Sequence, residues 1–118
     1  MTAGHPYIFV DFQQLPKIAC HCGEARRALL DEASVPYSLH VTLIKQQALV
    51  HYHKVTTETY FILECEQGAY LELDGQPVAV RPNSAVVISP GTKHRAVGAM
   101  KVAIIATPKF DPTDEFLE

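Results

Sequence analysis

The sequence predicts an all-β domain, either a sandwich or a barrel of many short strands. Short runs rich in Val, Ile, Leu, Tyr and Phe recur along the chain, and Gly, Pro, Asn or Asp residues separate them at similar intervals. Helical periodicity is weak throughout. The chain has 118 residues, of which 47% are hydrophobic and 19% are charged. This is enough to bury a core, and we expect one domain over residues 1–118.

The expected strands lie between these turn signals, and a polar C-terminal extension follows them. The Asp74-Gly75 pair suits a type I′ turn and predicts a hairpin. In the extension, Thr113 could begin a single helical turn, and Phe110 or Phe116 could dock on the barrel. We expect strands near residues 7–10, 25–31, 37–44, 48–53, 59–66, 69–73, 76–80, 84–88, 94–97 and 101–106.

The strand expected at 37–44 alternates between apolar and polar residues. One face holds Tyr37, Leu39, Val41 and Leu43, and the other holds Ser38, His40, Thr42 and Ile44. The apolar face predicts that this strand forms a wall of the core. His40 lies on the opposite face, where we expect a surface or interface residue.

Two histidines and a glutamate form the most informative motif in the chain. Side chains at positions i and i+2 of a strand point to the same face, so His51 and His53 project together. They lie about 7 Å apart at roughly 3.3 Å per residue. A tight reversal at residues 54–57 allows Glu58 to return beside them on the next strand. Two imidazoles and a carboxylate that converge are the outline of a divalent-metal site.

A third histidine completes this set if the strands close into a barrel. An apolar run ends at the Pro90-Gly91 turn, and His94 begins the following strand. Three imidazoles and one carboxylate suit Fe(II), Mn, Ni, Cu or Zn, with open positions for water or substrate. The alternative is four ordinary core residues, but burial of these polar groups without a common partner is costly. We therefore interpret the four residues as metal ligands.

These motifs resemble those of the cupins, which are small double-stranded β-helix, or jelly-roll, barrels. The cupin motifs read G-x5-H-x-H-x3,4-E-x6-G and G-x5-P-x-G-x2-H-x3-N. The matching positions here are His51, His53, Glu58, Gly91 and His94. The departures are Lys45, Cys65 and Asn83 in place of Gly, Ser89 in place of Pro and Gly98 in place of Asn. Asn tolerates the left-handed conformation almost as Gly does, and Gly68 is near enough to replace the glycine missing at Cys65.

The resemblance covers residues 37–106 and implies a cupin barrel there. N-terminal strands within 7–31 would precede the barrel, and a tail at 107–118 would follow it. The flanking segments 19–27 and 109–116 resemble those of small single-domain bacterial cupins, the cupin 2 or mannose-6-phosphate-isomerase-like group. That group has no settled activity, so the likeness implies the fold more than the function.

Tyr60 and two cysteines are further candidates near the site. Tyr60 shares the face of Glu58 and could relay a proton or simply be a core aromatic residue. Cys20 and Cys22 could be a soft-metal or redox pair, or could line the pocket from a loop over the barrel mouth. Because the chain has only one C-x-C pair, we favour small buried hydrophobic residues instead.

Arg26 and Arg27 lie on an expected strand, so one of them must face inward. An inward arginine could bind a substrate carboxylate or phosphate through two hydrogen bonds. The alternative is a surface ion pair with Glu24, Asp31 or Glu32. The pattern does not decide between the two.

The expected function is a metal-binding barrel that acts on a small oxygenated molecule. The metal would serve as a Lewis acid for isomerase or epimerase chemistry, or as an O2 site for dioxygenase chemistry. The alternatives are a non-catalytic module that binds or senses a small molecule and a structural barrel without metal. The net charge of −3 and the lack of basic blocks argue against nucleic acid, and no apolar run is long enough for a membrane span. We expect a homodimer, and the odd cysteine count and lack of a signal sequence predict a cytoplasmic location.

Overall fold

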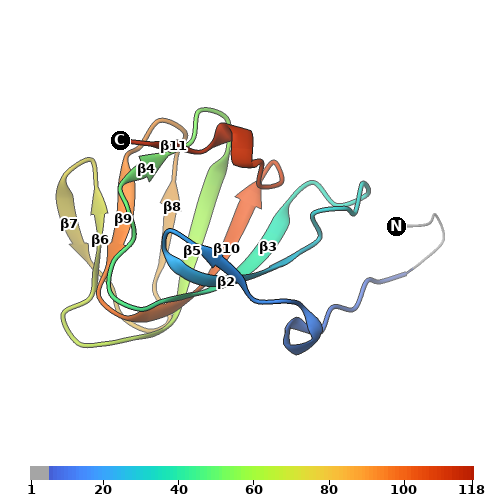
Figure 1. Ribbon diagram of the computed structural model, residues 1–118, viewed down its shortest axis with the longest axis horizontal. Helices are drawn as coiled ribbons and strands as arrows, with labels where there is room; N and C mark the ends of the chain where they lie inside the picture. The colour runs from blue at the N-terminus through green and yellow to red at the C-terminus, as the bar shows by residue number, and fades with distance from the viewer. Residues whose placement is uncertain (1–5) are drawn as a thin grey trace.

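Two antiparallel β-sheets form the walls of a barrel in the computed structural model, which describes residues 6–118 (Figure 1). The six-stranded sheet contains, in spatial order, β1 (Ile18–Cys20), β2 (Gly23–Ala28), β3 (Ser38–Ile44), β10 (Met100–Thr107), β5 (Thr57–Cys65) and β8 (Ala85–Ile88). The five-stranded sheet contains β11 (Phe116–Leu117), β4 (His51–Tyr52), β9 (His94–Val97), β6 (Tyr70–Leu73) and β7 (Gln76–Ala79). The fold is an all-β jelly roll, or double-stranded β-helix, as predicted.

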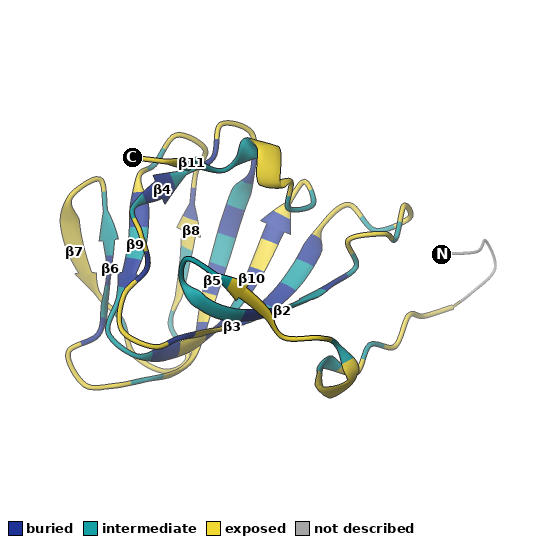
Figure 2. Cartoon of the chain, viewed as in Figure 1, coloured by how far each residue is buried: buried dark blue, intermediate teal, exposed yellow. Residues whose placement is uncertain are grey.

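The core lies between the two sheets because each strand turns alternate residues inward. Along β5 and β10, buried residues alternate with more exposed ones (Figure 2). Ile62 and Val102 from one sheet and Leu71 from the other are at most 1% exposed and belong to one cluster. Full burial of each such side chain stabilises the fold by about 2 kcal/mol.

The prediction for β3 was wrong about which face is buried. Ser38, His40 and Thr42 point inward and are at most 6% exposed, whereas Leu43 faces out and is 45% exposed. The inward polar groups are tolerated because they have partners: the Ser38 hydroxyl lies 2.8 Å from His40 Nε2. His40 is therefore a buried residue rather than a surface residue. The apolar face instead lies on the outside of the six-stranded sheet.

The turns follow the predicted residue chemistry. Asp74 and Gly75 have φ angles of 48° and 81° and connect β6 to β7 as a hairpin. Asn83, one of the departures from the cupin motif, adopts a φ of 71°, the conformation for which it can replace Gly. Gly68, with a φ of 86°, forms the turn after β5.

The N-terminal segment differs from the prediction. Residues 7–10 form no strand, and Tyr7 and Phe9 are 75% and 81% exposed because no neighbouring strand covers them. A 3₁₀ turn, η1 (Phe12–Gln14), follows, and strand β1, which the sequence did not predict, then pairs with β2. None of the helices formed by residues 6–118 is long and apolar enough to cross a membrane.

The C-terminal segment folds back across one end of the barrel (Figure 1). A 3₁₀ turn, η2 (Pro112–Asp114), covers the predicted helical turn, and β11 pairs with β4. Both phenylalanines dock, as either was expected to do. Phe116 stacks on Tyr52 with ring centroids 5.3 Å apart, and Phe110 lies edge-on to His40 at 5.7 Å.

Candidate metal centre

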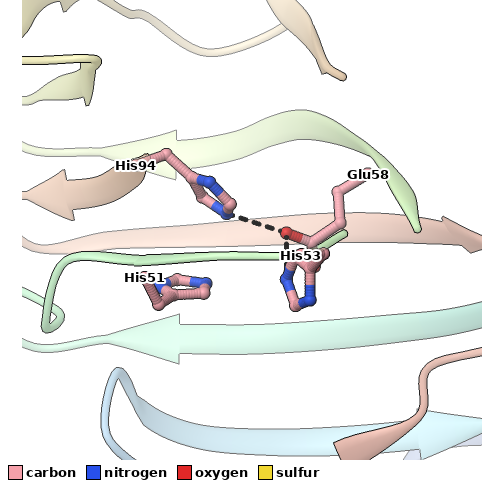
Figure 3. A group of neighbouring side chains, drawn as sticks. All are labelled: His51, His53, Glu58 and His94. Carbon is pink, nitrogen blue, oxygen red and sulfur yellow. Dashed lines mark hydrogen bonds and ion pairs between the residues drawn. The ribbon is translucent and has the colours of Figure 1, made fainter. Parts of the chain in front are cut away.

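The four predicted ligands converge between the two sheets (Figure 3). His51 lies on β4 directly opposite His94 on β9, His53 follows β4, and Glu58 projects from β5 in the other sheet. All four side chains are buried, with residue exposures between 2% and 7%. One ligand-type atom from each residue lies within 4.8 Å of those from the other three. The cluster could therefore hold a metal ion.

Glu58 is the centre of the cluster. Its Oε1 atom lies 3.1 Å from His53 Nε2 and 2.9 Å from His94 Nε2. Both contacts are drawn in Figure 3. His51 approaches from the side, with its ring centroid 4.2 Å from that of His94. The Nε2 atoms of His53 and His94 thus share one oxygen.

The backbone fixes the orientation of all three imidazoles. The Nδ1 atoms of His51, His53 and His94 lie 3.0, 2.8 and 2.8 Å from backbone carbonyl oxygens. The accepting carbonyls belong to Leu49, Asp114 and Thr92, respectively. Because a carbonyl can only accept, each Nδ1 carries a proton, and a ring that is neutral has its lone pair on Nε2. This is the arrangement by which proteins orient metal-bound histidines.

The arrangement needs a positive charge at its centre. Two Nε2 lone pairs aimed at a carboxylate oxygen repel it unless a proton or a metal cation lies between them. Burial opposes ionisation of Glu58, but its contacts with His53 and His94 outweigh the burial and hold the pKa of Glu58 well below its usual range. Burial also disfavours the charged form of His53, yet Glu58 outweighs it and raises the pKa of His53. In His51, burial and the nearby His94 lower the pKa to about 4.

Asp114 holds the segment between the first ligands and Glu58, a role the sequence did not reveal. Its carboxylate accepts hydrogen bonds from the backbone N–H groups of Lys54, Val55 and Thr56 at 2.9, 3.1 and 3.0 Å. Its own carbonyl holds His53. The C-terminal segment thereby completes the site. An acidic residue in a polar tail carries no sequence signal for such a distant contact.

A cavity of about 60 Å³ adjoins the cluster and is lined by His51 and Glu58. Tyr60 also lines it, with its ring 6.1 Å from that of His94. Burial, followed by the charge of Glu58, raises the pKa of Tyr60 well above its usual value, so its hydroxyl stays protonated. His40 lines the same cavity, and burial, followed by the charge of Arg27, lowers its pKa to about 4.

The two arginines separate as strand geometry requires. Arg27 lines the cavity, whereas Arg26 lies outside and donates to the Phe12 carbonyl at 2.6 Å. Neither arginine forms an ion pair with any residue of the described part of the chain, so the surface-pair alternative is wrong. Glu24 pairs with Lys45 instead. The guanidinium carbon of Arg27 lies 4.7 Å from the centroid of the Phe110 ring.

Cys20 and Cys22 form a disulfide, so the favoured expectation of two buried free thiols was wrong. The turn that carries them lines the cavity, as the loop alternative proposed. Gly23 closes this turn with a φ of 140°, and a Cβ there would collide with the Leu43 carbonyl. The expectation was based on the presence of a single C-x-C pair, but the turn between the paired strands β1 and β2 brings the two sulfurs of that pair together.

His21, which the sequence left unassigned, lies between these cysteines and contacts the cluster. Its ring centroid is 4.6 Å from that of His51, and its Nε2 lies 2.9 Å from Glu115 Oε1. The hydrogen bond from His21 lowers the pKa of Glu115. The β1–β2 turn and the C-terminal segment therefore meet above the candidate ligands.

Comparisons with known proteins agree with this architecture. Residues 39–105 match the cupin domain. A crystal structure of a protein from Planctomyces limnophilus is 34% identical, has a TM-score of 0.91, and aligns over 98% of this chain and 100% of that chain. No curated protein matched the chain.

More distant structures share the fold. Ectoine synthase from P. lautus is 18% identical, with a TM-score of 0.76 over 95% of this chain and 90% of that chain. The nucleoside dehydratase Pac13 from Streptomyces is 13% identical, with a TM-score of 0.76 over 95% of this chain and 94% of that chain. The family match covers more than half of the sequence, and the chain belongs to the cupin domain family.

Proposed function

We propose that this cupin binds a divalent transition metal through His51, His53, Glu58 and His94 and acts on a small oxygenated molecule beside it. The main observation in support is that a backbone carbonyl fixes the Nδ1 of each histidine and so directs its Nε2 toward the site. The mixture of imidazoles and a carboxylate suits Fe, Mn, Ni, Cu or Zn. Such a metal supplies Lewis-acid activation or oxygen chemistry.

The side chains of the cavity have distinct roles in this proposal. Glu58 remains ionised and balances the charge of the metal. Tyr60 keeps its proton and serves as a hydrogen-bond or proton donor to substrate oxygen. Isomerisation, epimerisation and dioxygenation all fit a small oxygenated substrate of this kind. The ectoine synthase and nucleoside dehydratase structures show that this fold supports chemistry on small molecules.

A non-catalytic module that binds or senses a small molecule is the second candidate. The state of the carboxylates favours this candidate. In the described part of the chain, the carboxylates that line the cavity are Glu58 and Glu115. Both already have imidazole partners, so neither is free to act as a general base. Under this proposal the metal would help to hold the ligand without turnover.

Metal content tests the ligand set directly. Elemental analysis of purified wild-type protein should give about one metal ion per chain, and His51→Ala and His94→Ala should lose it. His40→Gln is the matched control, because His40 is an equally buried histidine outside the cluster. Wild-type protein without metal under metal-replete conditions, or metal retained in both alanine variants, would refute the proposed centre.

Turnover separates the two candidate functions. Protein loaded with Fe(II), Mn(II) or Zn(II) is incubated with panels of sugar phosphates, diketones, catechols and small oxo acids. Turnover that disappears in both His51→Ala and His94→Ala supports an enzyme. Ligand-dependent thermal stabilisation without turnover in any metal form supports the binding module.

We also propose that two copies of the chain pair through the outer face of the six-stranded sheet. Leu43, Phe61, Val87 and Ile105 point outward from four different strands and are 45%, 39%, 65% and 40% exposed. The strand register places Val87 opposite Thr59, which is opposite Ile105, so these residues share one surface. An apolar surface of this kind is typical of an interaction site.

A further inference from the structure

Within residues 6–118, Arg27 is a cation without a counterion. Arg27 lines the cavity, and its Nε atom is buried without a hydrogen-bond partner in the described part of the chain. Among residues 6–118 it has no carboxylate partner, and its described contact is with the face of Phe110. A buried donor left unsatisfied costs stability, so an arginine in this state is suited to an anion from outside the chain.

Arg27 and Tyr60, which is two residues from the candidate ligand Glu58, lie at opposite ends of one inward-facing row. The strand register places Arg27 opposite His40, His40 opposite Ile104, and Ile104 opposite Tyr60. Three strand spacings of roughly 4.8 Å separate the backbones of Arg27 and Tyr60 by about 14 Å. Both side chains reach into the same cavity, which shortens the gap between their polar ends. A molecule of a few atoms could span it.

The size and charge of the cavity restrict what that molecule can be. A volume of about 60 Å³ favours a small ligand, since one water molecule already has a share of about 30 Å³ in the liquid. Arg27 is the one cationic lysine or arginine side chain lining the described cavity, and Glu58 and Glu115 already supply negative charge. A singly charged carboxylate is therefore better balanced there than a phosphate dianion.

We propose that Arg27 binds the carboxylate of a small carboxylic acid, which places the acid's other oxygen-bearing group beside Tyr60 and the candidate metal ligands. Phe110 supports the guanidinium from one face. His40, held by Ser38, forms the wall between the two ends. The inference rests on the proposed function, because it assigns a substrate class to the same cavity. Oxo and hydroxy acids of three or four carbons have this combination of groups.

Calorimetric titration with pyruvate tests this assignment. Pyruvamide is the uncharged analogue for comparison, and inorganic phosphate is the alternative anion. Wild-type protein should bind pyruvate more tightly than either. Arg27→Met should weaken pyruvate binding about tenfold to a hundredfold, the effect of losing hydrogen bonds to a charged group. Arg27→Lys should retain only part of the wild-type affinity for pyruvate, since an ammonium group cannot form the paired hydrogen bonds of a guanidinium. Arg26→Met, on the outer face of the same strand, should bind as the wild type does.

Different outcomes separate this inference from the metal proposal. Pyruvate binding that persists in metal-free His94→Ala and depends on Arg27 supports the inference even if the metal proposal fails. Binding abolished in His94→Ala but unchanged in both folded Arg27 variants overturns the inference and leaves the metal proposal intact. Phosphate binding tighter than pyruvate, equal binding of pyruvamide, or no binding of pyruvate to the wild type also overturns it.

Discussion

At the scale of single residues, the surroundings shift the pKa values of the histidines in different directions. His53 lies beside the carboxylate of Glu58, which raises its pKa. His40 and His51 are buried, and the pKa of each falls to about 4. Neutral histidines at neutral pH keep their lone pairs available, which a metal site and a hydrogen-bonding cavity both need. The same residue type therefore performs different tasks within one barrel.

Metal-free protein should lose stability as the pH falls from about 6.5 to about 4, in part because of His40. Its pKa is about 4 in the folded state, against an ordinary value of 6.5. In that range the unfolded chain binds more protons, so protonation favours unfolding. At 1.36 kcal/mol per pKa unit, His40 contributes on the order of 3 kcal/mol to this loss.

Urea unfolding at pH 7 and pH 4.5 measures the effect of His40. The difference in unfolding free energy between the two pH values should be smaller in His40→Gln than in the wild type. Glutamine does not titrate, so it removes the pH dependence while retaining a polar group near Ser38. An unchanged pH dependence in the variant would contradict the assignment.

At the scale of elements, the C-terminal segment connects the barrel to the candidate site. Asp111 accepts from the Thr113 N–H and begins η2, and that turn places Asp114 against the backbone of residues 54–56. Burial opposes the charge on Asp114, but hydrogen bonds from these backbone groups outweigh it and lower its pKa. The segment thus acts as a clasp between β4 and β5.

Asp114→Ala should weaken both stability and metal binding. Loss of three charge-assisted hydrogen bonds should lower the unfolding free energy by about 1–3 kcal/mol. Metal affinity should fall about tenfold or more, because the carbonyl that orients His53 would lose its support. Denaturant titration and competition with a metal chelator measure the two effects. Asp111→Ala is the matched control and should lower metal affinity less. An equal loss of metal affinity in both variants would contradict the role of Asp114 as a clasp.

The sequence predicted the local features of the elements better than their partners. The Asp74-Gly75 hairpin and the ligands His51, His53, Glu58 and His94 depend on short-range patterns, and the structure brings them together as expected. The inward face of β3 was predicted wrongly, because alternation alone does not reveal that a polar cavity takes the inside. The Cys20–Cys22 disulfide depends on the pairing of two strands, and the clasp of Asp114 depends on the C-terminal segment folding back onto the barrel. Composition encodes neither contact.

At the scale of the whole molecule, the barrel has a polar interior at one end and an apolar exterior on one wall. The six-stranded sheet supplies Glu58, Tyr60, His40 and Arg27 to the cavity from its inner face. Its outer face carries the exposed apolar residues of the proposed pairing surface. A partner on that wall would stiffen the strands that hold the cavity residues.

Light scattering at micromolar concentration should show a dimer of the wild-type chain. Val87→Lys should give a monomer, because a charged side chain would be buried at the interface. Val78→Lys is the matched control, since Val78 is also an exposed valine but lies on β7 of the other sheet. A monomeric wild type, or a Val87→Lys variant that remains dimeric, would contradict the proposed surface.

The clasp of Asp114 also bears on how the protein is made. Ribosomes synthesise β1 through β10 before residues 111–117, so every predicted ligand emerges before the segment that orients His53. A nascent barrel can close its sheets yet still lack a fixed site for the metal. Under the proposed function, capture of the metal would then follow synthesis of residues 111–117 and would favour chains that include this segment.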